Sequence, residues 1–418
     1  MRPRPQFLAV LAIASFLATG CGAAALPTAT PEPLQIRFAY PLELQTAYYE
    51  RLAAEFEAAN PGVDVLLLEG NPYNALASPT SPADAAEVDQ LAVAMLADSE
   101  LLRPLEPLLQ VSTDFDLGAF YEGTVQSLRY RGQLWGLPSD VDPWVLYFNK
   151  DLFDARGVAY PANDWTWDDL QAAAEQLADP TAEPSVYGLL TDVGRADFVP
   201  FVYQNGGSLV DSLVEPKAVT FTDLPTIEAV EWYAGLALNL AVAPTPTQLQ
   251  SLGGFEAAVL GRRGAMWYGA LSERGGLSWG SDWPFAWGAV APAGNRARMT
   301  LLSMRAYVLG AKAEQTGPAW EWLRYLVLHP STTFDLPPLK EASNSGALRS
   351  ALGEEVYAAA QEALSIGHTI PLTPWIADVG AWLGQAMQSV FDERMTVEAA
   401  LAVAQERADA LLAEQGSE

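Results

Sequence analysis

The sequence has few of the residues that build metal and redox sites, and little positive charge. It holds one cysteine, two histidines, and 23 lysines and arginines against 51 aspartates and glutamates, for a formal net charge of −28. One cysteine excludes an intramolecular disulfide framework. His329 and His368 have no cysteine partners and no zinc-motif spacing, and no phosphate-cradling glycine loop is found, so no metal and no cofactor are expected. A body this acidic is repelled by phosphate backbones, so no nucleic-acid partner is expected either.

The N-terminal hydrophobic run is also short. Residues 7–17 fall below the roughly twenty apolar residues that a helix needs to cross a bilayer. The run follows Arg2 and Arg4 and is followed by small residues. This order is typical of a secretory signal, so we predict that residues 1–20 form a signal peptide.

The only cysteine stands directly after this signal. Residues 17–21 (LATGC) resemble the bacterial lipoprotein box, in which the chain is cleaved before the cysteine and lipid is attached to it. The resemblance implies a lipid on Cys21 that anchors a secreted protein at the extracellular or periplasmic face of the membrane. Residues 21–33 are rich in Ala, Thr and Pro and are predicted to form an extended tether. The alternative is an ordinary signal peptide with an incidental cysteine.

Strand and helix patterns alternate in the rest of the chain. Residues 36–40 and 63–68 are short apolar runs typical of strands, and apolar side chains recur at helical spacing over residues 49–56 between them. Strand, helix and strand in this order predict a parallel βαβ unit and an α/β fold class. Residues 71–82 are expected to form a loop, and residues 87–96 a helix.

Two long helices with apolar faces over residues 379–390 and 397–411 are expected to close the chain.

Aromatic residues are plentiful, with 13 tryptophans and 15 tyrosines. Five tryptophans stand in or beside predicted helices and are expected in the core: Trp165, Trp167, Trp232, Trp320 and Trp322.

Two neighbouring segments carry the clearest resemblance to a known family. Residues 132–138 (GQLWGLP) and 145–153 (VLYFNKDLF) are similar to a continuous pattern of the family 1 extracellular solute-binding proteins of ABC importers, the maltose-binding type. One departure is the segment 83–89, which lacks the clear "PDV" that the family usually shows after its second strand. Either Asp84 or Asp89 of this segment therefore faces the ligand. Weaker similarities follow in the family's order at residues 164–170 (DWTWDDL), 204–207 (QNGG), 255–267 (FEAAVLGRRGAMW), 287–294 (WGAVAPAG) and 320–326 (WEWLRYL).

The resemblance implies a periplasmic-binding-protein type II fold: two α/β lobes, a three-strand hinge and a ligand cleft between the lobes. It also implies a function, the capture of a mono- or oligosaccharide by hinge closure and its delivery to ABC permease subunits, by a monomer without enzymatic activity. The chain is expected to cross between the lobes near residues 140, 288 and 337. The expected bounds are 34–140 and 289–336 for lobe 1, and 141–288 and 337–418 for lobe 2.

Candidate ligand-binding residues follow from the chemistry of sugars. A sugar ring needs flat aromatic side chains against its faces and carboxylates, amides or Arg for its hydroxyl groups, because buried polar groups must be paired. For each aromatic candidate the alternative is a packing role, and for the charged ones it is a solvated or lobe-bridging charge. The candidates are Tyr40, Asp89, Asp142, Trp144, Trp267, Tyr268, Arg305 and Trp375.

One motif suggests an enzyme instead. Residues 276–280 (GLSWG) match the G-x-S-x-G nucleophile elbow, and Asp335 and His368 follow in the order of a hydrolase triad. The elbow requires a buried strand directly before it, whereas residues 272–275 have the composition of a loop. Three alternatives stay open: the same fold with a non-sugar solute such as a polyamine or a phosphoester, a secreted glycoside hydrolase that uses two carboxylates, and an adhesion or sensor lipoprotein.

Overall fold

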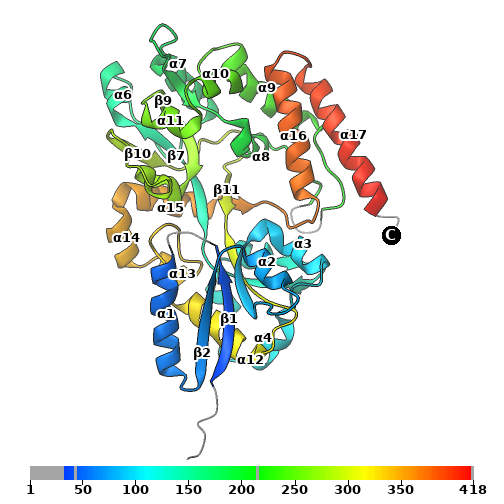
Figure 1. Ribbon diagram of the computed structural model, residues 1–418. Helices are drawn as coiled ribbons and strands as arrows, with labels where there is room; N and C mark the ends of the chain where they lie inside the picture. The colour runs from blue at the N-terminus through cyan, green and yellow to red at the C-terminus, as the bar shows by residue number, and fades with distance from the viewer. Residues whose placement is uncertain (1–32, 42–44, 213–215, 416–418) are drawn as a thin grey trace, which may run out of the picture.

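The computed structural model of the chain describes residues 33–41, 45–212 and 216–415. The predicted signal peptide, Cys21 and residues 22–32 of the predicted tether lie outside these residues. The described chain forms two α/β lobes that meet at a narrow waist (Figure 1).

The first lobe is built on a five-stranded sheet. Strand β1 pairs in parallel with β2 along its whole length, and helix α1 connects the two, which confirms the predicted βαβ unit. β12 runs antiparallel to β3 and β6. Across the sheet the strands are β2 (Val63–Glu69), β1 (Leu34–Tyr40), β3 (Ala85–Asp89), β12 (Arg305–Leu309) and β6 (Gly136–Pro138). The other elements of this lobe are α1 (Thr46–Ala59), α2 (Pro72–Ala77), η1 (Gln90–Ala92), α3 (Val93–Asp98), α4 (Glu106–Val111), η2 (Leu117–Ala119), α5 (Glu122–Gln126), the β4 (Arg129–Tyr130) and β5 (Gln133–Leu134) hairpin, and α12 (Thr316–Leu328).

Two local predictions in this lobe are wrong. Residues 71–82 contain helix α2, because the Asn71 side chain accepts a hydrogen bond from the backbone N–H of Asn74 and Pro72 suits the first turn. Residues 87–96 are not one helix, because strand β3 extends to Asp89 before η1 and α3 begin. The alanine-rich run before Asp89 pairs with β1 and β12, so tertiary pairing overrides its helical propensity.

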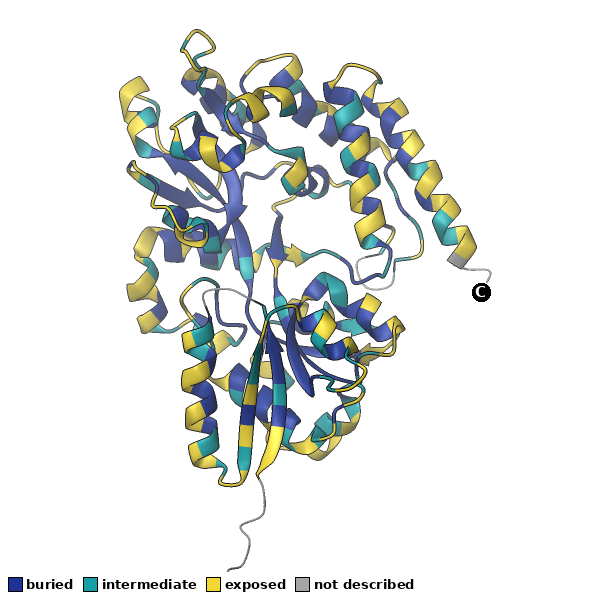
Figure 2. Ribbon diagram, in the orientation of Figure 1, coloured by how far each residue is buried: buried dark blue, intermediate teal, exposed yellow. Residues whose placement is uncertain are grey.

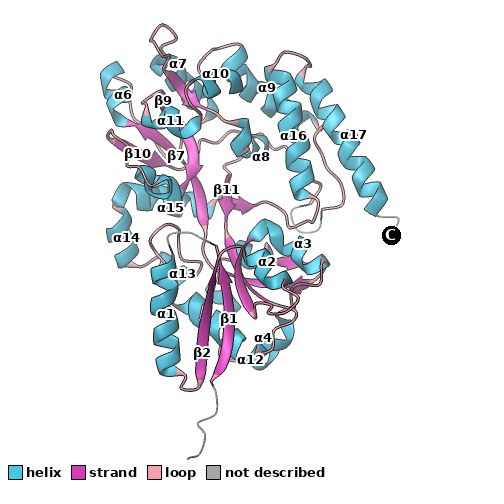
Figure 3. Ribbon diagram, viewed as in Figure 1, coloured by secondary structure: helices cyan, strands magenta, loops and turns pink. Residues whose placement is uncertain are grey.

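The second lobe is built on a six-stranded sheet, and helices surround it (Figure 3). Across this sheet the strands are β13 (Gly367–Thr369), β11 (Thr300–Ser303), β7 (Asp142–Asn149), β9 (Gly264–Ala270) and β8 (Tyr187–Leu190), and β10 (Trp287–Val290) also pairs with β7. The helices between the crossings are α6 (Lys150–Arg156), α7 (Trp167–Leu177), η3 (Val193–Arg195), α8 (Val199–Gln204), α9 (Leu224–Leu238), α10 (Pro246–Ser251), α11 (Phe255–Leu260) and η4 (Leu271–Trp279). The C-terminal helices are α13 (Lys340–Ser343), α14 (Gly346–Leu352), α15 (Glu354–Ser365), α16 (Ile376–Phe391) and α17 (Val397–Gln415).

The segments that carry the family resemblance include helix starts with side-chain caps. Asn149 ends the buried strand β7, and its side chain accepts the N–H of Leu152 at 3.2 Å to begin α6. Thr166 and Asp169 form a reciprocal capping box at the start of α7. Polar residues in these segments therefore fix where these two helices begin.

The chain passes between the lobes at three adjacent segments. Residues 139–141 join β6 to β7, Met304 joins β11 to β12, and residues 334–336 return from α12 towards the second lobe. The Ser139 N–H donates to the Arg305 carbonyl at 3.0 Å, and Val141 and Leu336 exchange two backbone bonds of 2.9 Å. These bonds tie the three segments together at the waist.

One expected crossing lies elsewhere. β10, which contains residue 288, runs antiparallel to β7 within the second sheet, and β11 pairs with β7 as well. The chain therefore remains in the second lobe through Ser303 and crosses at Met304. The apolar segment 287–290 adds a strand to the buried β7, which explains why it does not leave this sheet.

Each lobe has a large hydrophobic core of its own (Figure 2). The five tryptophans predicted for the core are buried or pack against it. Val379, Leu383 and Val390 of α16 face inward, as their spacing predicted. Within the described ranges, no helix combines the length and the apolar character that crossing a membrane requires.

Candidate ligand pocket at the waist

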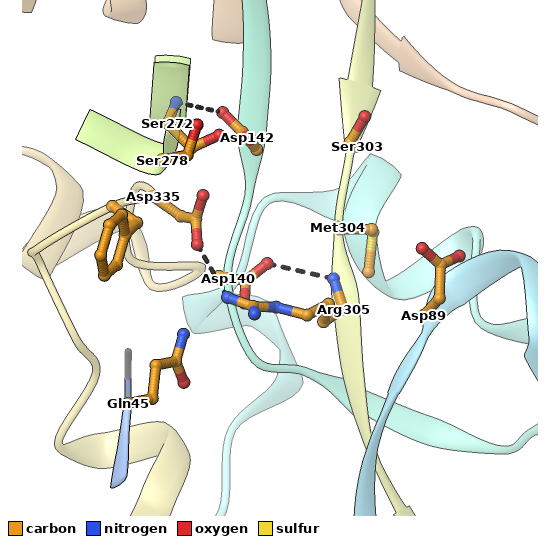
Figure 4. A pocket seen from close by; sticks show the side chains of 11 residues that line it. Gln45, Asp89, Asp140, Asp142, Ser272, Ser278, Ser303, Met304, Arg305 and Asp335 are labelled. Carbon is orange, nitrogen blue, oxygen red and sulfur yellow. Dashed lines mark hydrogen bonds and ion pairs between the residues drawn. The ribbon is translucent and has the colours of Figure 1, made fainter. Parts of the chain in front are cut away.

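A cavity of about 410 Å³ lies where the three crossing segments meet. Its volume falls in the range of small-molecule sites. We call it the waist pocket; Figure 4 shows its side chains converging from both lobes. It is lined by Gln45, Asp89, Asp140, Asp142, Ser272, Ser278, Ser303, Met304, Arg305, Phe334 and Asp335.

Arg305 is the central cation of the waist pocket. Its Nε donates to Asp140 Oδ2 and its Nη2 to Asp335 Oδ2, both at 2.8 Å, and Nε lies 3.7 Å from Glu87 Oε1. Asp140 comes from the first crossing, Arg305 follows the second, and Asp335 belongs to the third. Burial alone would lower the pKa of Arg305, but the surrounding carboxylates raise it above its usual value. One guanidinium therefore links all three crossings.

The pocket has more carboxylates than Arg305 can neutralise. Burial raises the pKa of Asp142 to about 6, although its carboxylate accepts the backbone N–H of Ser272 at 3.0 Å. Burial, with Asp140 and Asp142 nearby, also raises the pKa of Asp335 well above its usual value. Burial raises the pKa of Glu87, behind Arg305, to about 7. Such a site favours a ligand that donates hydrogen bonds or carries positive charge, and it disfavours an anion.

The structure brings three of the predicted ligand-binding residues together. Asp89, Asp142 and Arg305 all line the waist pocket, and Asp89 is the register partner of Arg305 across β3 and β12. Trp144 lies just behind the lining, where its Nε1 donates to the Ser303 hydroxyl at 3.3 Å.

The other four predicted residues do not line this pocket. Tyr40 is buried against Tyr49, with ring centroids 4.7 Å apart. Trp267 and Tyr268 stand on β9, whose residues are all buried, so their rings enter the core on either side of the sheet. Trp375 is buried in the second core just before α16. All four side chains pack in cores, which is the alternative that their sequence positions left open.

Asp84 and Asp89, the two aspartates of segment 83–89, have different positions. Asp84 is buried, and its carboxylate accepts backbone N–H groups of Arg37, Glu314 and Gln315 at 2.9, 2.8 and 3.3 Å. Asp89 stands at the end of β3 and lines the waist pocket. Asp84 thus fastens backbone segments together, and Asp89 faces the cavity.

Sequence reasoning missed several lining residues. Asp140 stands two residues before a predicted candidate, so its place at the expected first crossing was an available signal. Asp335 was considered only as a member of a hydrolase triad. Ser278 of the GLSWG motif lines the pocket from η4, an irregular turn segment, whereas His368 on β13 is exposed and is not among the lining residues. Among the described residues, no group of three or more His, Cys, Asp and Glu side chains is placed to hold a metal ion.

Known proteins share this architecture. An ABC substrate-binding protein from Listeria monocytogenes, solved in complex with cycloalternan, matches with a TM-score of 0.79 at 21% identity, covering 91% of this chain and 99% of that one. The sugar-binding protein MalE from Xanthomonas citri matches with a TM-score of 0.78 at 17% identity, covering 91% of this chain and 98% of that one. These likenesses establish the periplasmic-binding-protein type II fold.

Sequence comparison supports the same assignment. A Brucella abortus protein described only as a binding protein is 30% identical over 146 residues, which are 34% of this chain and 35% of that relative. The alignment thus spans about a third of the curated relative. The family model for bacterial extracellular solute-binding proteins matches residues 40–331, well over half of the 418 residues. The chain belongs to the family of bacterial extracellular solute-binding proteins.

Proposed function

We propose that this protein binds a carbohydrate in the waist pocket and delivers it to the permease of an ABC importer. The observation that carries the proposal is the position of the pocket on all three crossing segments. A ligand held by Asp142, Arg305 and Asp335 contacts every connection between the lobes. Its binding energy can therefore favour one relative orientation of the lobes, as hinge closure requires.

The polar lining suits sugar hydroxyl groups. Carboxylates accept their hydrogen bonds, and the three serines that line the pocket both donate and accept. The proposal also draws support from the relatives, since one solved neighbour was crystallised with cycloalternan and another is named a sugar-binding protein. We place the hinge between a first lobe of residues 34–140 and 304–336 and a second lobe of residues 141–303 and 337–418.

We further propose that a lipid on Cys21 anchors the protein on the outer face of the membrane. The support is the lipoprotein-like segment 17–21 and the Pro-rich stretch that follows it. Strand β1 begins at the end of the first lobe remote from the waist (Figure 1), so a tether joined there leaves the pocket clear. A Cys21→Ser variant should appear in the culture medium or soluble extract, and its retention in the membrane fraction would contradict the anchor.

Thermal-shift screening of the purified protein tests the solute class. The panel should contain common hexoses, pentoses and their oligosaccharides, with spermidine and sugar phosphates as the other classes. We expect neutral sugars to raise the melting temperature, and we expect Asp142→Asn to reduce that rise without lowering the melting temperature of the free protein. A response to sugar phosphates alone would contradict the proposal.

A second candidate is a cationic solute, favoured by four lining aspartates against one lining cation, Arg305, with Arg274 acting on Asp142 and Asp335 from outside the lining. A response to spermidine and silence towards sugars would establish it. We propose binding rather than hydrolysis, since Ser278 stands in an irregular turn and not at a strand-to-helix elbow. Turnover of aryl glycosides by the pure protein would overturn that part.

A further inference from the structure

A second cavity adjoins the waist pocket. It measures about 700 Å³, and Asp89 lines both cavities, so the two meet at this side chain. We call it the apolar cleft. Leu91 and Met95, from η1 and α3 of the first lobe, form one wall. The facing wall comes from the second lobe and includes Val193, Phe198, Ile370 and Ile376.

The chemistry of the apolar cleft differs from that of the waist pocket. Its walls are mainly aliphatic, with Tyr73 and Phe198 as the aromatic residues of its lining, and neither cavity has a tryptophan in its lining. Met95 is 46% exposed and Ile376 is partly exposed, so apolar surface faces the opening. A plain oligosaccharide that extended along these walls would find few partners for its hydroxyl groups, and unpaired polar groups are costly to bury. An alkyl or aryl group would instead be buried favourably there.

We propose that the solute is an amphipathic glycoside. Its sugar occupies the waist pocket, and its aliphatic or aromatic aglycone lies along the apolar cleft. This inference rests on the proposed function, because it takes the waist pocket as the sugar site. The polar lining of the waist pocket and the apolar lining of the cleft meet at Asp89. The glycosidic bond of the bound solute therefore lies near that side chain.

Calorimetry measures the aglycone contribution by comparing glycosides that share one sugar and differ in the aglycone. For each of glucose, galactose, mannose, xylose and arabinose, the methyl, butyl, hexyl and phenyl glycosides would be titrated into the full-length protein below their micelle concentrations. We expect affinity to rise about fourfold for each methylene that becomes buried. 1-Hexanol alone should not bind measurably, since it lacks the sugar. Equal affinity for the methyl and hexyl glycosides would overturn the inference and leave the proposed function standing.

A variant of Ile376 tests whether the apolar walls contact the aglycone or contact only each other when the lobes close. Ile376→Ser should weaken hexyl glycoside binding about tenfold and leave methyl glycoside binding unchanged. Val403→Ser is the matched control, because Val403 is an exposed apolar residue of α17 that does not line the cleft. If Ile376→Ser weakens both glycosides equally, the apolar walls serve lobe closure and the inference fails. If no glycoside or free sugar binds the unaltered protein, the proposed function fails with it.

Discussion

Replacing Arg305 by methionine removes the cation that links the three crossings. The guanidinium has two 2.8 Å ion pairs, and its side chain is only 22% exposed. Methionine keeps most of the volume but leaves Asp140, Asp335 and Glu87 close together without a counter-charge. Breaking a buried pair by removing one partner costs about 3–5 kcal/mol, so we expect the free energy of unfolding to fall by about this amount at pH 8.

The loss of stability in the Arg305→Met variant should depend on pH. Without Arg305 the pKa values of Glu87 and Asp335 rise further in the folded protein, because like charges and burial both disfavour ionisation. A carboxyl group whose folded pKa is raised contributes stability below its unfolded pKa and loses it as pH rises through the folded pKa. The pKa of Glu87 is already about 7. The destabilisation should therefore be smaller at pH 5 than at pH 8.

Urea unfolding at pH 5 and pH 8, followed by tryptophan fluorescence, measures both effects. Arg296→Met is the matched control: Arg296 also pairs with a carboxylate at 2.8 Å, but it is 54% exposed, and such pairs contribute less than about 1 kcal/mol. Arg305→Lys should fall between the two, because lysine keeps the charge without the two-pronged geometry. Equal losses for Arg305→Met and Arg296→Met, or a loss independent of pH, would refute the reasoning.

Substitutions of Asp84 and Asp89 should have opposite effects on stability and on sugar affinity. Asp89→Asn keeps an oxygen that can accept the backbone N–H of Leu91, a 2.8 Å bond that begins η1, so it should weaken sugar binding about tenfold or more in calorimetry with little change in melting temperature. Asp84→Ala should instead cost about 1–3 kcal/mol of stability in urea titration; the reverse pattern would contradict their placement. Trp267→Ala should cost about 3–5 kcal/mol of stability and leave affinity at low temperature unchanged, because the ring is fully buried; intact stability with lost binding would return Trp267 to the site. Burial raises the pKa of Asp197 to about 7 although Tyr233 donates to it, so its folded form loses stability as pH rises from about 4 to 7. Asp197→Asn should flatten this pH dependence by on the order of 4 kcal/mol, and unchanged pH curves would contradict the assignment.

Local patterns predicted much of the architecture. The βαβ start, the closing helices and the five core tryptophans follow from spacing that burial enforces. The crossing at Met304 was not predictable in this way. Residues 287–290 and 300–303 are apolar segments suited to either sheet, and only tertiary pairing assigns both to β7.

The sequence predicts only part of the waist pocket, because tertiary contacts bring the rest of its lining together. Asp142 and Arg305 stand near expected crossings, so position alone made them candidates. Asp335 joins them through contacts across 30 residues or more, which no local pattern encodes. Trp267 and Tyr268 resemble cleft aromatics in sequence. β9, however, pairs with a strand on each side, and its two faces pack against different clusters that include helix residues, which buries every residue of the strand.

The position of the bound solute tests the central claim most directly. A crystal structure of the complex, grown with the sugar that gives the largest thermal shift, should show its hydroxyl groups within hydrogen-bonding distance of Asp142, Arg305 or Asp335 between closed lobes. Density for the sugar at another surface, with the waist pocket holding only water, would contradict the account.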